Sequence, residues 1–540
     1  MSVICMLSLT IVSAAMLALG IPNEIFSTGA GILGLFALVP LYLAIYQTKR
    51  WWQAGLCGSL MMTLVHVFSS FWLAYFKEFA IFTLGASSAA YFFLGMGVGW
   101  FLRYALLQKP HLRPFLFAAV WTVWEWGKSI GFLAYPWGTL VMTSRDLVPL
   151  IQIADITGTW GISFLLALVS ATTAEAIIFL RENGFHCITT YVQKDAAVTM
   201  CKTVASTLFL LGIVCSYGYI RLKNQPIADT SLDVVLVQQD ANSWDNGNQK
   251  KVIINSEKLT EKAIAHAGKK PDLVIWSEST LSWPYEENKA FYRRYPNEYP
   301  LGSFLSDINT PLLVGCPVTV DAAQDKFSNS VILLSPDGRI LDSYAKMQLV
   351  PFAEYMPFTQ YAWVRKFFDT LVGFSSGWEP GRELKTMSVT NHEGKQIHFA
   401  APICFEDAFA SLIAKLHNTG SDVLINLTND SWSQTNSAEY QHFVIASFRA
   451  IELRTTLIRS TNAGYSVVVD PCGKVLHDMP LFVSAASFFS VPIYPHITTF
   501  YARYRDWLPL LLMIIVFMMI AGSFRFRTQS DLYRRDIQRT

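Results

Sequence analysis

Three residues in the second half of the chain have types and positions that suit catalysis, and the first is Cys404. It follows Ile397–Ile403, an apolar run typical of a buried strand, and precedes a run with helical spacing of apolar residues. Backbone amides converge at such a turn, and the helix dipole there favours a thiolate, so Cys404 is a candidate nucleophile. The alternative is an inert cysteine in the core, the more common role of an unpaired thiol.

Two further polar residues also follow apolar runs. Glu278 ends a strand-like run, where partial burial raises the pKa of a carboxyl group and suits it to act as a general base. Lys346 is a lone cation after a hairpin, and it can stabilise an oxyanion or lower the pKa of a nearby thiol. The alternatives are a helix-capping or surface role for Glu278 and a solvated position for Lys346. Glu354 either orients Lys346 or forms an ordinary salt bridge.

The region 222–506 contains the elements that must position these residues. Its alternation of strand-like and helix-like runs, with tight-turn signals such as Pro336-Asp337-Gly338, predicts a mixed α/β sheet covered by helices. The strands are expected at Leu232–Gln238, Asp272–Ser277, Pro311–Cys316, Ser328–Ser335, Ile397–Ile403, Asp422–Leu427 and Gly464–Val469, and the helices at 249–266, 407–417 and 438–454.

No motif in the sequence indicates a cofactor or a metal. There is no phosphate-binding loop, no dinucleotide fingerprint and no CxxC or Cys/His spacing of a metal site. The net charge of +2 gives no indication of a nucleic-acid partner. A disulfide among Cys316, Cys404 and Cys472 is possible, but nothing in the sequence favours one.

The rest of the chain is that of a membrane protein. Of its 540 residues, 52% are hydrophobic and only 15% are charged, whereas soluble domains have about 25% charged residues. The first apolar run lacks a basic leader and is followed at once by another, which favours a retained helix over a signal peptide. Runs long enough to span a bilayer are predicted at 2–20, 29–47, 54–75, 81–107, 114–133, 159–180, 203–221 and 507–524.

Basic residues orient these spans. The positive-inside rule places both termini in the cytoplasm and the block 222–506 outside the membrane, in the periplasm of a double-membrane bacterium. The opposite short loops carry only Lys77 and Arg145, with Lys128 near the end of a span. The residues assigned to the cytoplasmic side are Lys49, Arg50, Arg103, Lys109, Arg113, Arg181, Lys194, Lys202, Arg525, Arg527, Arg534, Arg535 and Arg539.

Aromatic residues gather in three places. Around Glu125 they are Trp124, Trp126 and the run Tyr135–Gly138, which form either an interfacial belt or a place where lipid enters. The segments 283–300 and 352–379 are either mobile lids that dip into the bilayer surface or covers for a sheet edge.

Taken in chain order, Glu278, Lys346 and Cys404 resemble the Glu-Lys-Cys triad of the carbon–nitrogen hydrolase (nitrilase) superfamily. With the predicted spans, essentially the whole chain resembles the apolipoprotein N-acyltransferase family. The motifs that carry the resemblance are Trp276-Ser277-Glu278, Lys346 with Leu349–Glu354, Cys404-Phe405-Glu406, Asn429-Asp430 with Trp432, Gln441-His442-Phe443, Arg449-Ala450 with Glu452, and Arg459–Asn462.

The resemblance implies a fold and a reaction. The fold is an α-β-β-α sandwich, the periplasmic domain 222–506, placed on a bundle of eight transmembrane helices formed by 1–221 and 507–540. The reaction transfers an acyl chain from the sn-1 position of a phospholipid to the α-amino group of a diacylglyceryl-cysteine. That cysteine begins an apolipoprotein, and this is the last step of bacterial lipoprotein maturation. The enzyme would be a monomer in the inner membrane and would need no cofactor.

The resemblance also assigns roles. Cys404 carries the acyl group as a thioester in a ping-pong mechanism, Glu278 moves protons and Lys346 holds the oxyanion. Glu354 and Glu406 support the triad, and Trp244 lies near the substrate, unless it is a simple surface-loop aromatic residue. Phe405 departs from the tyrosine common in the family, which removes a hydroxyl group beside the nucleophile.

Two other functions are compatible with parts of the sequence. A membrane-tethered amidase or nitrilase has the same triad, but a small soluble substrate does not require the membrane spans or the aromatic segments. A transporter or scaffold is the second alternative. A transporter should show inverted repeats and broken helices with polar groups at mid-membrane, for which only Glu125 and Asp155 are candidates.

Overall fold

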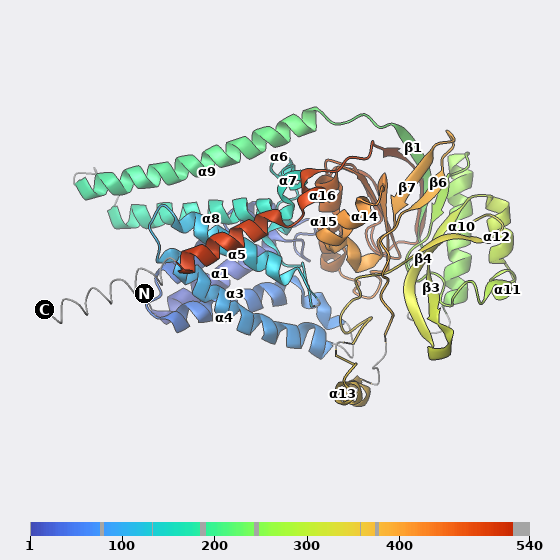
Figure 1. Ribbon diagram of the computed structural model, residues 1–540, viewed down its shortest axis with the longest axis horizontal. Coiled ribbons are helices and arrows are strands. Elements are labelled where there is room, and N and C mark those ends of the chain that lie inside the picture. The colour runs from blue at the N-terminus through green and yellow to red at the C-terminus, as the bar shows by residue number, and fades with distance from the viewer. Residues whose placement is uncertain are drawn as a thin grey trace.

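The computed structural model consists of a helical domain and an α/β domain that meet along a broad boundary (Figure 1). It describes residues 2–75, 80–131, 133–183, 191–241, 248–356, 358–372 and 377–521. The helical domain contains the chain up to Lys223 together with a last apolar helix, Trp507–Ala521. The α/β domain lies between these two parts of the sequence.

The α/β domain is built on two six-stranded sheets, β12-β1-β2-β3-β4-β5 and β11-β10-β9-β8-β7-β6. The three middle strands β1–β3 of the first sheet are parallel, as are β7–β9 of the second. The strands are β1 Thr230–Gln238, β2 Leu273–Ile275, β3 Leu312–Asp321, β4 Lys326–Leu334, β5 Ile340–Ala345, β6 Met387–Thr390, β7 Gln396–Ala400, β8 Val423–Thr428, β9 Thr456–Thr461, β10 Val467–Val469, β11 Val475–Asp478 and β12 Ala485–Ile493.

Helices cover the outer faces of both sheets and complete four layers (Figure 1). α10 (Gln249–Ala267) and α12 (Leu301–Ile308) lie on the first sheet, whereas α14 (Ala410–His417) and α15 (Asn436–Leu453) lie on the second. α10 ends at Gly268, whose φ of 66° is the left-handed conformation that closes many helices. The predicted α-β-β-α sandwich is confirmed.

Several strands have no clear signature in the sequence. β9 is fully buried, yet it contains Arg459 and three hydroxyl residues, so it lacks the apolar run that marks β8. β12 lies at a sheet edge and is mostly half-buried, which weakens its apolar pattern. The strand predicted at Gly464–Val469 begins only at Val467, and the helix predicted from 407 begins only at Ala410.

The helical domain has the composition of a membrane bundle, and we refer to it as the membrane domain. Among the described residues, four helices are long and apolar enough to cross a bilayer, at Val3–Gly20, Thr83–Leu106, Thr159–Glu182 and Lys194–Lys223. The apolar helices Gly31–Tyr46, Val148–Thr157 and Trp507–Ala521 are shorter, so the count of eight spans stays a prediction. The bundle contains α1 Val3–Gly20, α2 Val39–Tyr46, α3 Trp51–Ser69, α4 Ser87–Leu106, α5 Arg113–Lys128, α6 Val148–Ile151, α7 Ala154–Thr157, α8 Thr159–Asn183 and α9 Tyr191–Lys223.

Small residues let two of these helices approach closely. A Cβ atom added to Gly58 of α3 would lie 2.1 Å from the carbonyl oxygen of Gly95 in α4, and one added to Gly99 would lie 2.1 Å from that of Ala54. Glycine at these positions therefore allows the backbones of α3 and α4 to touch, as small residues do between membrane helices.

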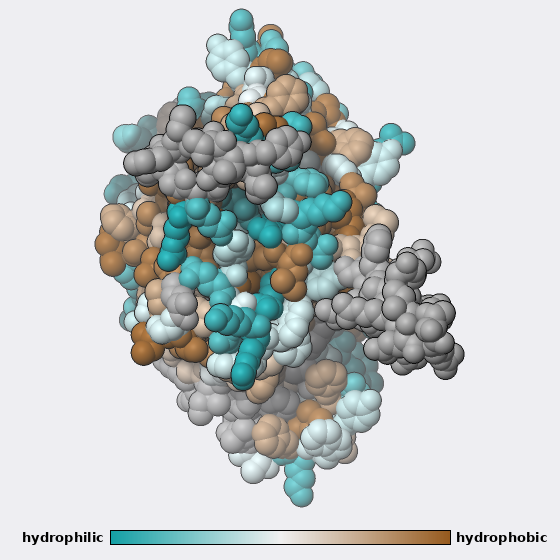
Figure 2. All heavy atoms as spheres, turned by 90° about the vertical axis from the view of Figure 1, so that its left-hand side faces the viewer, coloured by the Kyte–Doolittle hydropathy of each residue, from teal (hydrophilic) through white to brown (hydrophobic). Residues whose placement is uncertain are grey.

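The end of the membrane domain far from the sandwich is polar. Figure 2 shows this end, where hydrophilic side chains gather in the centre of the face and apolar ones surround them. Lys49 and Arg50 before α3, and Lys109 between α4 and α5, are exposed. This distribution agrees with a bundle whose basic end lies in water.

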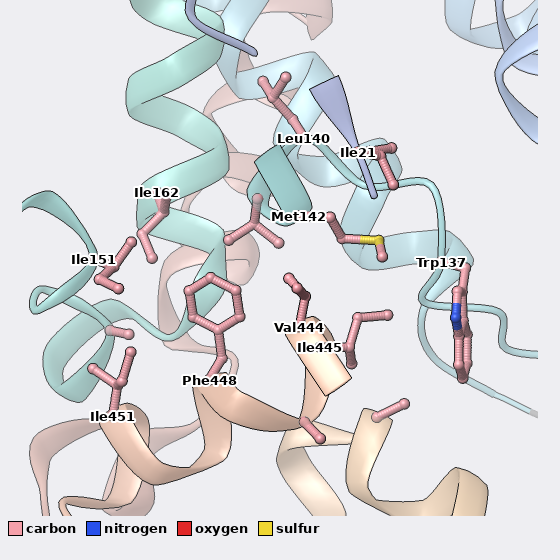
Figure 3. Close-up of a cluster of buried hydrophobic side chains, with 14 of the residues drawn as sticks. Ile21, Trp137, Leu140, Met142, Ile151, Ile162, Val444, Ile445, Phe448 and Ile451 are labelled. Atoms are coloured by element: carbon pink, nitrogen blue, oxygen red, sulfur yellow. The ribbon is translucent and has the colours of Figure 1, made fainter. Parts of the chain in front are cut away.

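α15 joins the two domains. All but two of its residues, Asn436 and Tyr440, are buried, because the second sheet lies on one side and the membrane domain on the other. Figure 3 shows Val444, Ile445 and Phe448 of this helix pointing toward Leu140, Met142 and Ile162 of the membrane domain. One continuous apolar core therefore spans the boundary.

A buried ion cluster lies at the same boundary. Asp155 of α7 is 2.9 Å from the Nε atom of Arg454, which follows α15, and 2.9 Å from Arg221 of α9. The hydroxyl group of Tyr217 donates to both oxygens of Asp155 at 2.8 Å. Arg454 also donates to the side-chain oxygen of Gln152 at 2.6 Å. Asp155 therefore anchors the membrane domain to the end of α15.

We predict that Asp155→Asn lowers the midpoint of thermal unfolding in detergent, because it leaves Arg454 buried without its anion. Removing one partner of a buried ion pair costs about 3 kcal/mol. Asp146→Asn is the matched control, since Asp146 is exposed in the same part of the chain. Equal midpoints for the two variants would contradict this role of Asp155.

Candidate active site

The structure brings Glu278, Lys346 and Cys404 together, although each comes from a different element. Glu278 follows β2, Lys346 follows directly after β5, and Cys404 begins η7, the short 3₁₀ helix Cys404–Ala408. All three line one cavity of about 400 Å³, together with Glu354. Pockets of this size hold a substrate in many enzymes.

Cys404 lies on a constrained turn. β7 ends at Ala400, Ile403 forms a bridge with Leu427 of β8, and the backbone then turns at Cys404 with a φ of 48°. This left-handed conformation is unfavourable for a residue with a Cβ atom and is typical of functional turns. The side-chain amide of Asn426 donates to the carbonyl oxygen of Cys404 at 3.1 Å and fixes the turn. The sequence suggested an α-helix directly after the nucleophile, but a 3₁₀ turn comes first.

Glu278 is held by donors on both oxygens. Asn329 donates to its Oε1 atom at 2.8 Å, and the backbone N–H of Asn429 donates to its Oε2 atom at 2.8 Å. Lys346 Nζ lies 3.5 Å from Oε1, and Glu278 is also hydrogen-bonded to the Cys404 thiol. Burial raises the pKa of Glu278, while Lys346 opposes this shift. These donors favour a carboxylate that can accept a proton from the thiol.

Lys346 is almost fully buried between two carboxylates. Its Nζ atom lies 2.8 Å from Glu354 Oε1 and 3.5 Å from Glu278. Burial alone lowers the pKa of a lysine, but Glu354 and Glu278 outweigh it and raise the pKa of Lys346 well above its usual value. The backbone N–H of Val350 donates to Glu354 Oε2 at 2.8 Å, which holds that carboxylate in place. Lys346 is thus a fixed cation next to Cys404.

Cys404 rests as a thiol. Burial raises the pKa of the thiol well above its usual value, Glu278 adds to the shift, and Lys346 opposes it. We expected the turn to favour a thiolate, but burial and a carboxylate neighbour dominate here. Glu278, which is hydrogen-bonded to this thiol, is placed to accept its proton.

Glu406 connects the segment after Lys346 with the turn before Cys404. Its Oε1 atom accepts the backbone N–H groups of Met347 at 2.7 Å and Gln348 at 3.1 Å, and its Oε2 atom accepts that of Ile403 at 2.8 Å. The hydroxyl group of Tyr344 donates to both oxygens. Burial raises the pKa of Glu406 to about 7.

Phe405 contacts the membrane domain. Trp137 stacks on its ring with centroids 5.4 Å apart and an angle of 7° between the planes. Trp137 is buried, so it belongs neither to a lipid-facing belt nor to an open site for lipid. Glu125 is buried near it and accepts the backbone N–H of Leu140 at 2.6 Å. Its function in the structure is to hold the loop that carries Trp137.

Residues 13–172 match the apolipoprotein N-acyltransferase N-terminal domain, and residues 234–485 match the carbon–nitrogen hydrolase family. Apolipoprotein N-acyltransferase 2 of Treponema denticola is 48% identical over 96% of this chain and 97% of its own length. The protein of the same name from Treponema pallidum is 42% identical over 94% of this chain and 92% of its own. Apolipoprotein N-acyltransferase of Borreliella burgdorferi is 32% identical over 96% of this chain and 95% of its own length. The chain belongs to the apolipoprotein N-acyltransferase family. It is therefore an N-acyltransferase with a carbon–nitrogen hydrolase domain.

Next to Cys404, this acyltransferase has a charged network. Three of its members lie in the motifs named above, but the sequence did not predict that they contact one another. His442 lies 2.8 Å from Asp407 and 3.1 Å from Asp430, and Arg459 lies 3.5 Å and 3.6 Å from the same two residues. Asp407 follows Cys404 in η7, and Asp430 follows the Asn429 amide that holds Glu278. The network therefore braces both segments. Asn329 was also missed, although a polar Ser-Asn-Ser run within the buried strand β4 was a signal.

The two aromatic-rich segments differ from each other. Tyr285 and Tyr292 of 283–300 are buried in the sandwich core, so much of that segment covers the first sheet. α13 (Ala362–Val372) lies apart from both sheets (Figure 1), and Trp363 at its start is 74% exposed. Trp283 and Phe291 of 283–300 are exposed, so each segment has aromatic side chains at the surface, and those of α13 are the more exposed.

Some of the residues named in the sequence analysis cannot be placed. Trp244, Lys77, Phe374 and the basic tail 525–539 lie outside the described residues. All seven described cysteines are free thiols, so Cys316, Cys404 and Cys472 form no disulfide.

We predict that Glu406→Gln slows acyl transfer by roughly 10- to 100-fold, because an amide nitrogen would face backbone N–H groups and leave at least one of them unsatisfied, at about 1–3 kcal/mol. The initial rate of acyl transfer measures this. Glu286→Gln, on an exposed residue, is the control and should retain the parent rate. An unchanged rate in Glu406→Gln would show that the two segments do not depend on this carboxylate.

We also predict a pH-dependent contribution of His442 to stability. Burial lowers its pKa, but Asp430 and Asp407 outweigh burial and raise it from 6.5 to about 9. The folded protein therefore binds the proton more tightly than the unfolded chain. This adds roughly 3 kcal/mol to the free energy of unfolding. The contribution is fully present below pH 6.5 and is lost as the pH rises through about 9.

Thermal unfolding of the parent and of His442→Gln between pH 6 and pH 10 (about the range in which this group titrates) measures that contribution. The difference in midpoint between the two proteins should shrink as the pH rises. His266→Gln, on an exposed residue, should have the same unfolding midpoint as the parent at every pH. A difference independent of pH would mean that His442 is neutral in the folded protein.

Proposed function

We propose that this N-acyltransferase moves an acyl chain from the sn-1 position of a membrane phospholipid to the α-amino group of the diacylglyceryl-cysteine of an apolipoprotein. The observation that carries the proposal is the cluster of Glu278, Lys346 and Cys404 at one cavity, next to the membrane domain. Nucleophile, base and cation are the groups that acyl transfer through a covalent intermediate requires.

In the first half-reaction, the Cys404 sulfur attacks the ester carbonyl carbon as its proton passes to Glu278. Negative charge develops on the carbonyl oxygen, where Lys346 and the backbone amide of Phe405 stabilise it. The tetrahedral intermediate collapses, the ester C–O bond breaks, and Glu278 returns the proton to the departing lysophospholipid oxygen. The acyl group remains on Cys404 as a thioester.

In the second half-reaction, the α-amino group of the apolipoprotein attacks the thioester carbon. Glu278 accepts a proton from the amine, Lys346 again faces the oxyanion, and the C–S bond breaks. Glu278 gives this proton to the departing Cys404 sulfur atom. The products are the amide and the thiol of Cys404, so the enzyme returns to its initial state. Donor and acceptor use the same cavity in turn, which is a ping-pong mechanism.

The contacts of the cavity with the membrane domain support lipid-anchored substrates. Trp432 lines the cavity, and Trp72 of the membrane domain packs against it with centroids 5.6 Å apart. Gln441 donates to the backbone oxygens of Pro22 and Ser69, both at 2.8 Å. A soluble amidase has no need of such a boundary, so these contacts favour lipid substrates over small amides.

We further propose the placement of the enzyme and the roles of its accessory residues. The protein is a monomer in the bacterial inner membrane, with eight spans and with its catalytic domain in the periplasm. Glu354 and Glu406 position the triad, α13 acts as a lid that dips into the bilayer surface, and Trp244 lies near the substrate. The exposed aromatic side chains of α13, Trp363 and Phe367, support the lid role.

We predict that the purified protein gains the mass of one acyl chain when it is incubated with phosphatidylethanolamine in detergent without acceptor. Intact-protein mass spectrometry measures the gain, and neutral hydroxylamine should remove it because it cleaves thioesters. Cys404→Ala should show no gain. Lys346→Met should slow the gain by roughly 100-fold or more, since an oxyanion donor contributes about 3 kcal/mol or more.

Each other outcome has a clear meaning. No gain on the parent, with the phospholipid unconsumed, would contradict the lipid-donor half of the proposal. A gain that persists in Cys404→Ala would place the acyl group on another residue. Consumption of phospholipid with release of free fatty acid and no acylated protein would indicate hydrolysis in place of transfer.

A further inference from the structure

A second cavity lies at the boundary between the two domains. Its volume is about 380 Å³, and it shares no lining residue with the Cys404 cavity. Thr159 and Trp160, which begin the apolar helix α8, line it, and so does Asp506, directly before the apolar helix Trp507–Ala521. The cavity therefore lies where apolar helices end, which is the level of lipid head groups in a bilayer.

The cavity contains a buried cation with unused donors. Arg449 of α15 is only 2% exposed and lines the cavity. Its Nε and Nη1 atoms are buried and have no hydrogen-bond acceptor among the described residues, although Glu452 Oε2 lies 3.0 Å from Nε. Buried N–H groups that lack a hydrogen bond are costly even in an ion-paired guanidinium, so the Nη1 donor above all indicates a ligand that carries acceptor oxygens.

The charges around Arg449 favour an anion. Lys415 of α14 also lines the cavity and is exposed. Glu452 is the ion-pair partner of Arg449, and burial raises the pKa of Glu452 to about 7 although Arg449 opposes this shift. Asp506 adds one carboxylate at the membrane side, and the Trp160 indole donates to it at 3.3 Å. The residues that line the cavity thus include two cations, Arg449 and Lys415, and one carboxylate, Asp506.

The remaining walls suit a lipid. Ile130, Phe409, Leu412 and Ile445 provide apolar surface, and the hydroxyl group of Ser411 provides a further donor. A phosphate diester carries acceptor oxygens for Arg449 and Lys415, and an ethanolamine amine complements Asp506. A free anion would not require the apolar walls.

We propose that this cavity binds the phosphate head group of a second membrane phospholipid, distinct from the acyl donor at Cys404. Arg449 and Lys415 bind the phosphate oxygens, and Asp506 faces the amine. The inference depends on the bilayer placement in the proposed function and not on acyl transfer. The lipid also contacts Met347 and Gln348, whose backbone N–H groups hold Glu406, so its binding stabilises the segment after Lys346.

The test uses full-length Cys404→Ala protein in nanodiscs of phosphatidylethanolamine and phosphatidylglycerol. These contain a small share of phosphatidylethanolamine with a photoreactive diazirine on its head group. After irradiation, labelled peptides are identified by mass spectrometry. We expect labelling of 408–415 and 445–449. Lys415→Gln should lower it several-fold and Arg449→Gln roughly tenfold, because charge-assisted hydrogen bonds to the phosphate are lost.

Lys258→Gln, on an exposed residue of α10, is the matched control and should label as the parent does. Labelling of 278–282 in the Cys404 cavity serves as an internal reference. A variant that keeps this label is folded. Arg449→Gln leaves Glu452 without its cation and can fail to fold, so Lys415→Gln is the second variant that keeps the inference testable. Loss of label at 278–282 alone would count against the proposed function and leave this inference standing.

Three results would overturn the inference. The first is absence of label at 408–415 and 445–449 while 278–282 is labelled. The second is equal labelling by a diacylglycerol that carries the same diazirine, because phosphate would then play no part. The third is complete displacement of the label by excess inorganic phosphate, which would show a site for a free anion.

Discussion

In the candidate active site, the relative position of Lys346 and Cys404 depends on one buried carboxylate, that of Glu406. Lys346 and Cys404 belong to different sheets, and nothing in the covalent chain holds them at a fixed separation. Glu406 accepts backbone N–H groups from both segments, so it sets the position of the cation relative to the thiol. Three backbone donors and a tyrosine hydroxyl group compensate for the burial of this carboxylate.

Other buried charges near Glu406 are also compensated by close partners. The imidazole of His442 lies between Asp407, which follows the nucleophile, and Asp430, which follows the Glu278 anchor. Burial of these groups is tolerated because each charge has an opposite charge close by. α15 carries His442 and also packs on the membrane domain, so the position of the catalytic groups depends on the fit between the two domains.

Much of the fold was predictable where a local pattern determines the structure. Apolar runs located β1, β2, β4 and β8, and helical spacing located α10 and α15, because burial imposes a period on those segments. Glu278, Lys346 and Cys404 were found by their positions at strand ends. The residues that orient them, such as Asn329 and Trp137, were missed or misinterpreted because their roles arise from contacts far apart in the sequence. No pattern along one element reveals that Trp137 stacks on Phe405.

The way in which the first sheet is closed determines when its edge is completed during synthesis. β1, the first strand of the sandwich, pairs along its whole length with β12, the last strand, in a nine-residue antiparallel ladder from Thr230–Ile493 to Gln238–Ala485. Until β12 has been made, one edge of β1 has unpaired backbone groups, and exposed edges of this kind invite wrong pairing. The first sheet therefore stays open along β1 until residues 485–493 have joined it. A chain truncated before residue 485 keeps this edge unpaired.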